Sequence, residues 1–113
     1  MARTRAPLGA LTAAQVLEMA TREGAKALGI DEEVGTLEAG KRADLVVLDG
    51  ERLGVGGDPA TRIVFGGGSR AVRDVMVDGQ LVVKEGRSLR FDEAEVCSKA
   101  EEAAAALRKR AAI

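Results

Sequence analysis

Residues 35–42 carry the glycine and lysine spacing that comes nearest to a chemical motif. Gly35, Gly40 and Lys41 match G-x-x-x-x-G-K, a loop that binds nucleotide phosphates through its backbone N–H groups and its lysine. Arg42 stands where that motif needs a serine or threonine to hold magnesium. The flanking patterns predict a helix before this stretch and a strand after it, which reverses the order around a phosphate loop. We therefore expect a turn that leads into a strand.

Side chains that could serve as nucleophile, base or metal ligand are scarce. The sequence has no histidine, which removes the commonest general base and the commonest metal ligand. Without a base, the single cysteine and the serines are not activated as nucleophiles: Cys97, Ser69, Ser88 and Ser98. The acidic groups at 31–33 and 101–102 are typical of solvated surface, and the other aspartates belong to turns and strand ends: Asp44, Asp49, Asp58, Asp74 and Asp78. We predict no catalytic, cofactor-binding or metal-binding residue in this chain.

Charge and composition exclude several further classes. The 17 basic and 18 acidic side chains leave a net charge of −1, whereas a nucleic-acid binder needs an excess of basic residues. Arg3 and Arg5 ahead of the apolar stretch 8–14 suggest a signal peptide, but Pro7 and Gly9 interrupt it. No apolar run approaches the ~20 residues that span a bilayer. With a single cysteine that fits a reducing compartment, these features favour a cytoplasmic protein that binds neither nucleic acid nor membrane.

The first element that could position any site is a helix over residues 12–29. Thr12 and Gln15 form the T-x-x-Q capping box, and Gly29 is suited to a left-handed helix end. Gly24 inside the pattern indicates either close packing or a break between two short helices. Apolar residues recur at helical spacing: Val16, Leu17, Ala20, Ala27 and Leu28.

A strand is predicted over residues 44–49. Four consecutive apolar residues, 45–48, indicate that both faces of this strand are buried. Residues 51–70 are rich in glycine and proline, and we predict an irregular loop with one short apolar element, Ile63-Val64-Phe65.

A β-hairpin is predicted over residues 72–85. Its strands, 72–77 and 80–85, flank Asp78-Gly79, a pair that favours a two-residue turn. Met76 should then oppose Leu81, and Val75 should oppose Val82. Both faces of the ribbon are apolar, so it needs further strands to be stable.

The last predicted element is a helix that begins after Asp92, with Glu95 completing a D-x-x-E start. Basic residues 108–110 complement the negative end of its dipole. Its apolar stripe is mostly alanine, so we expect it to lie against a partner surface without anchoring a core: Val96, Ala100, Ala103, Ala104 and Leu107.

Several of these segments together resemble the C-terminal end of the amidohydrolase superfamily. The resemblance rests on residues 17–21 and 24–29, on 35–49, on Asp58-Pro59 with 63–65, and on 72–86. It extends from about Leu11 to Glu95 and is closest to cytosine, guanine and S-adenosylhomocysteine deaminases and atrazine chlorohydrolase. The near-match to a phosphate loop is then the family's turn before a strand.

This resemblance implies an α+β fragment. It would comprise the last helices of a (β/α)8 barrel (residues 1–30), the C-terminal strands of a composite β-sandwich (31–90), and an Ala-rich C-terminal helix (91–113). The family's zinc or iron is held by an H-x-H pair, further histidines and a late aspartate, and none has a matching position here. A barrel needs about 250 residues, so this chain cannot contain one. Its expected partner is the missing N-terminal barrel segment or, in a homo-oligomer, another copy of this chain.

The implied function is that of a hydrolase acting on carbon–nitrogen bonds other than peptide bonds. In the family, the metal makes hydroxide from water for deamination of a cyclic amidine or nucleobase-like substrate. The chain would be the C-terminal piece of such an enzyme and inactive alone. The alternative is a non-enzymatic interaction module that docks on a separate barrel chain or self-associates through an open sheet edge.

Overall fold

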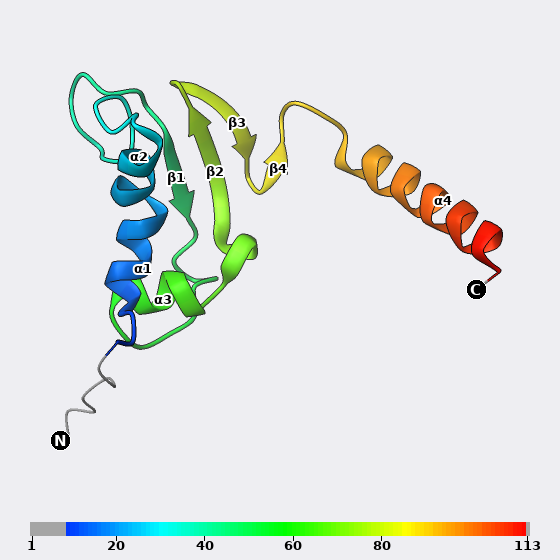
Figure 1. Ribbon diagram of the computed structural model, residues 1–113, viewed down its shortest axis with the longest axis horizontal. Helices are drawn as coiled ribbons and strands as arrows, with labels where there is room; N and C mark the ends of the chain where they lie inside the picture. The colour runs from blue at the N-terminus through cyan, green and yellow to red at the C-terminus, as the bar shows by residue number, and fades with distance from the viewer. Residues whose placement is uncertain (1–8, 113) are drawn as a thin grey trace.

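Four α-helices, a 3-10 turn and four strands make up the described part of the chain, residues 9–112 of the computed structural model (Figure 1). The order is α1 (Ala13–Ala20), α2 (Arg22–Leu28), β1 (Leu45–Leu48), α3 (Pro59–Phe65), the 3-10 turn (Gly68–Ala71), β2 (Val72–Val77), β3 (Gln80–Lys84), β4 (Arg87–Ser88) and α4 (Glu93–Ala111). The signal-peptide pattern on Arg3, Arg5 and Pro7 lies outside the described residues.

The N-terminal helical pattern is two helices that meet at Thr21. The capping box is present: Thr12 N donates to Gln15 Oε1 at 2.9 Å and Gln15 N donates to Thr12 Oγ1 at 3.2 Å. Thr21 leaves the helical region at φ −124°, ψ −101°, which breaks the run three residues before Gly24. Gly24 also marks a close approach, because a Cβ there would lie 2.9 Å from Met19 O. Gly29 ends α2 at φ 70°, as predicted.

The strands form one antiparallel sheet in the order β1-β2-β3-β4. Asp78 and Gly79 both have positive φ in the predicted two-residue turn. Met76 opposes Leu81 as predicted, but Val75 opposes Val83. The predicted pairing with Val82 is wrong because a bulge between Val75 and Met76 shifts the register by one residue.

The prediction of an irregular loop over residues 51–70 is wrong for its second half. Residues 59–65 form α3, and a 3-10 turn follows. Asp58 caps α3 by accepting a hydrogen bond from Thr61 N at 3.1 Å, and Pro59 occupies the first turn, where its missing N–H costs nothing. Asp-Pro was therefore a helix start inside a glycine-rich stretch.

The core is small. Within residues 9–112, only Ala25 and Ala71 are buried. The predicted burial of both faces of β1 is wrong for this chain, because Val46 is 53% exposed. The sheet and helices therefore present apolar side chains that this chain leaves half covered.

Helix α4 extends away from the sheet and from the other helices (Figure 1). Asp92 caps it by accepting from Ala94 N at 2.9 Å and Glu95 N at 3.2 Å, as predicted. No residue of α4 is buried. Across the described residues, no helix combines the length and apolar character that crossing a membrane requires.

Candidate functional site

Two of the predicted turn aspartates meet in space, at the tip of the hairpin. Asp44 Oδ1, just before β1, accepts a hydrogen bond from Asp78 N at 2.7 Å. Ala43 O accepts from Gly79 N at 3.1 Å beside it. These bonds join the start of β1 to the β2–β3 turn. The contact is carboxylate to backbone, so the pair is not an acid–base dyad and instead holds the sheet together.

Asp74 of β2 binds the backbone at the end of β3. Its Oδ1 accepts from Glu85 N at 3.0 Å, and its Oδ2 lies 2.8 Å from Arg73 Nε. The hydrogen bond from Glu85 N, reinforced by the Arg73 guanidinium, lowers the pKa of Asp74 below its ordinary value. A carboxylate held ionised in this way anchors a turn and is a poor proton donor.

Lys41, the lysine of the phosphate-loop pattern, contacts acidic residues of the segment between α2 and β1. Lys41 Nζ donates to Asp31 O at 2.5 Å and lies 3.2 Å from Glu38 Oε2. Hydrogen bonds from Thr36 and Lys41 lower the pKa of Glu38, which keeps a negative charge where a phosphate would sit. The segment runs from α2 into β1, which is the expected order, and it serves as a structural turn.

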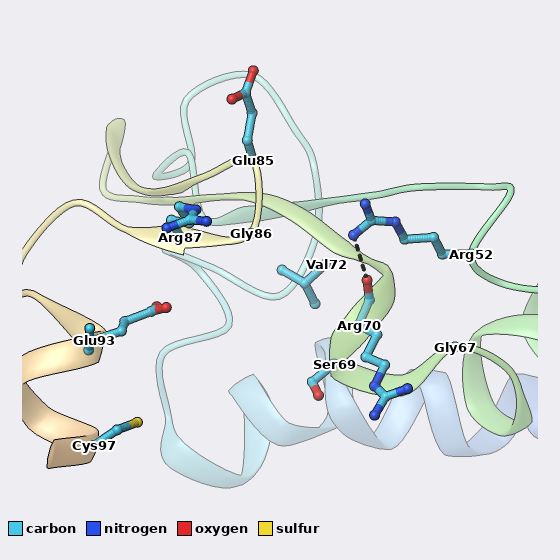
Figure 2. A pocket seen from close by; sticks show the side chains of 11 residues that line it. Arg52, Gly67, Ser69, Arg70, Val72, Glu85, Gly86, Arg87, Glu93 and Cys97 are labelled. Atoms are coloured by element: carbon cyan, nitrogen blue, oxygen red, sulfur yellow. Dashed lines mark hydrogen bonds between the residues drawn. The ribbon is translucent and has the colours of Figure 1, made fainter.

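An open hollow of about 980 Å³ lies between the end of the sheet and the start of α4 (Figure 2). Its lining includes Arg52, Arg70, Arg87, Glu93 and Cys97. Arg52 Nη1 donates to Arg70 O at 3.3 Å, while the guanidinium groups of Arg70 and Arg87 point in different directions (Figure 2). Because the charged groups do not converge and Cys97 is exposed, the hollow has no arrangement that could activate a nucleophile.

A second, apolar cleft of about 800 Å³ separates α1 and α2 from the sheet. Leu17 and Leu28 line it from the helices, and Leu45 and Met76 line it from the strands. Its polar groups are few, and none is a histidine or cysteine. The cleft has the character of a packing surface rather than of a reaction site.

Zinc chemistry does not fit the donor atoms present. The full sequence lacks histidine, and residues 9–112 contain no group of three His, Cys, Asp or Glu side chains placed to hold an ion. The acidic groups 31–33 and 101–102 are not part of any such cluster.

Sequence reasoning missed the cap at Asp58 and the 3-10 turn that buries Ala71. The Asp-Pro dipeptide could have revealed the first. Nothing in the local pattern marks Ala71, whose burial depends on contacts distant in sequence.

The sequence matches a profile described as the amidohydrolase family over residues 2–82. Among curated proteins, 5-methylthioadenosine/S-adenosylhomocysteine deaminase of Desulforudis audaxviator is 41% identical over 96 residues, which are 83% of this chain and 22% of the relative.

Solved structures agree with this match. A zinc-bound adenosine deaminase from Xanthomonas campestris superposes with a TM-score of 0.78 at 29% identity, covering 88% of this chain and 23% of that protein. Atrazine chlorohydrolase from Arthrobacter aurescens, complexed with zinc, gives a TM-score of 0.70 at 33% identity, covering 82% and 21%. The chain thus spans about a fifth of the length of the proteins it matches.

Proposed function

The chain belongs to the amidohydrolase family, and from this premise we propose that it is the C-terminal part of a metal-dependent hydrolase of carbon–nitrogen bonds. The reaction would be deamination of an adenosine-type substrate, the chemistry named for its deaminase relatives. The catalytic residues and metal ligands would lie on a barrel segment that this chain does not include.

One observation carries the proposal. The similarity fills most of this chain but only 22–23% of the deaminases, while the metal ligands the family uses have no counterpart here. A chain that resembles an enzyme closely and lacks its reacting groups is best explained as one part of that enzyme.

The small core agrees with the proposal that this chain is one part of a larger enzyme. We assign α1 and α2 (within residues 1–30) to the end of the barrel, the strands (within 31–90) to half of a composite sandwich, and residues 91–113 to an appended helix. The apolar cleft and the half-exposed Val46 are then surfaces for the N-terminal segment. Burial of such side chains would contribute roughly 25 cal/mol per Å² of apolar surface covered.

A complementation experiment tests the proposal. The Desulforudis deaminase is expressed without the segment that matches this chain, and this chain is supplied separately. We expect recovery of soluble complex and of ammonia release from 5-methylthioadenosine in the presence of zinc. The chain alone with zinc should release none. Turnover by the isolated chain, or failure to form any complex, would refute the proposal.

A matched pair of variants makes the test specific to the surface. Val46→Asp places a charge on β1, where we expect covering, and should block complementation because a buried unpaired charge is costly. Val55→Asp makes the same change at a fully exposed position in the loop between β1 and α3 and should complement normally. If both variants complemented equally well, the N-terminal segment would not contact β1 at Val46.

The unpaired edge of β1 favours a second candidate, a non-enzymatic module that docks on a separate barrel chain or self-associates edge to edge. Size-exclusion chromatography separates the two. A folded, discrete oligomer of the isolated chain that involves β1 favours the module, whereas aggregation relieved by the barrel segment favours the enzyme part.

A further inference from the structure

Helix α4 carries a long apolar stripe, Val96, Ala100, Ala103 and Leu107, whose members are all exposed. Its 19 residues make a rod of about 28 Å. Val96 is 51% exposed and Leu107 is 58% exposed. The first turns of α4 border the hollow beside the sheet, where Glu93 contacts Ser88, and the rest of the helix projects outward (Figures 1 and 2).

The two ends of α4 carry opposite charges. The first turn has Glu93 and Glu95, and the last turn has Arg108, Lys109 and Arg110. Side by side in the same direction, two copies would place like charges together. In opposite directions, each acidic end meets a basic end, and the helix dipoles oppose as well.

The spacing of the stripe fits this antiparallel arrangement. Val96, Ala100, Ala103 and Leu107 are separated by four, three and four residues, which is the alternation of a coiled-coil seam. When two copies are aligned with Val96 opposite Leu107, Ala100 falls opposite Ala103 and Glu93 falls opposite Arg110. Each layer then pairs a large residue with a large one, a small residue with a small one, or an acid with a base.

We propose that α4 is a self-association helix whose partner is α4 of a second copy of this chain, packed antiparallel about a two-fold axis between Ala100 and Ala103. The alanines allow the two backbones to approach closely. Glu93 keeps one carboxylate oxygen on Ser88 N at 3.0 Å, which fixes the side chain at the end of the seam while leaving the other oxygen free for Arg110 of the partner copy.

The rest of the molecule tolerates this arrangement. The sheet and other helices are joined only to the N-terminal end of α4 (Figure 1). In the antiparallel pair they would therefore lie at opposite ends of the rod. A seam with two Val–Leu layers is small, so we expect a weak, concentration-dependent dimer. The inference uses α4 alone and stands independently of the proposed enzymatic role.

Sedimentation equilibrium of the full chain tests the seam. The wild type should form dimers at hundreds of micromolar, and Leu107→Glu should weaken association by at least about tenfold, because it places two acidic groups in a C2 seam. Ala105→Glu, on the opposite face of the same turn, should dimerise like the wild type. Circular dichroism confirms that both variants remain helical.

Thiol cross-linking tests the direction. Cys97 and residue 104 lie along the same edge of the antiparallel pair, whereas residue 105 points away from it. We expect Ala104→Cys to give covalent dimers with a short bis-maleimide much faster than Ala105→Cys or the wild type. A monomer at all concentrations, equal loss in both glutamate variants, or equal cross-linking at 104 and 105 would overturn the proposal.

Discussion

Replacing Gly35 by alanine should loosen the packing of the 30–44 segment on α2. Gly35 has φ +94°, and an added Cβ would lie 2.7 Å from Ala25 Cβ and 3.1 Å from Arg22 Cα. Carbon atoms in contact prefer about 3.5–4.0 Å. Ala25 is one of the two buried residues in the described range 9–112. The Ala25 Cβ and Arg22 Cα that the added Cβ would meet are both held by the helix, so the turn must move away from it.

Gly40→Ala is the matched control, because the two glycines differ only in what surrounds them. Gly40 has φ +92°, with nothing within 4 Å of its added Cβ. Left-handed strain costs about 1–2 kcal/mol at either position. Overpacking adds about 1–3 kcal/mol at Gly35 alone. The unfolding free energy should therefore fall by about 2–5 kcal/mol for Gly35→Ala and by about 1–2 kcal/mol for Gly40→Ala.

Urea titration followed by circular dichroism measures both variants against the wild type. The decisive quantity is the difference between the two alanine variants, in which the backbone strain cancels. A difference near zero would show that the turn does not pack on α2 as described. A larger loss for Gly40→Ala would refute the reasoning outright.

Three further predictions follow from local contacts. The pKa of Asp74 is lowered in the folded chain, so its contribution to stability is complete above the ordinary pKa of 3.8 and is lost as the pH falls through the lowered value. The acid unfolding of Asp74→Asn should lack this loss. An identical acid transition in the variant and the wild type would contradict the prediction. Thr12→Ala should destabilise α1 by about 1 kcal/mol through loss of its cap, while Thr12→Ser should not, as amide hydrogen exchange in α1 can report. Zinc added to the chain alone should give no saturable heat by calorimetry and leave the melting temperature unchanged, since residues 9–112 lack a ligand cluster; tight binding would contradict the assignment of the metal to another segment.

Local chemistry made the boundaries of most elements predictable. Thr12 with Gln15, Gly29, Asp78-Gly79 and Asp92 each act within a few residues, and each behaves in the structure as the pattern indicates. The family was also recognisable from the amino-acid pattern within residues 17–49. The match to the amidohydrolase family confirms that prediction.

The features that escaped prediction depend on distant contacts. The bulge that brings Val83 opposite Val75 lies in β2, which pairs with both β1 and β3, and hairpin spacing alone does not encode it. Helix α3 was not predicted because it has only seven residues, and the glycines on both sides of it indicated an irregular loop. The exposure of Val46 contradicts the burial predicted from its apolar run, since such a run indicates a strand but does not specify what covers it.

The uncovered edge of β1 also bears on the lifetime of the chain in a cell. Apolar strands with unpaired N–H and C=O groups are templates for aggregation, and chaperones and proteases triage chains that expose such surface. Steady-state abundance should then track the supply of whatever covers β1, so that an unmatched excess is removed. We expect a pulse-chase measurement to give a longer half-life for this chain when the barrel segment is expressed with it than when it is absent.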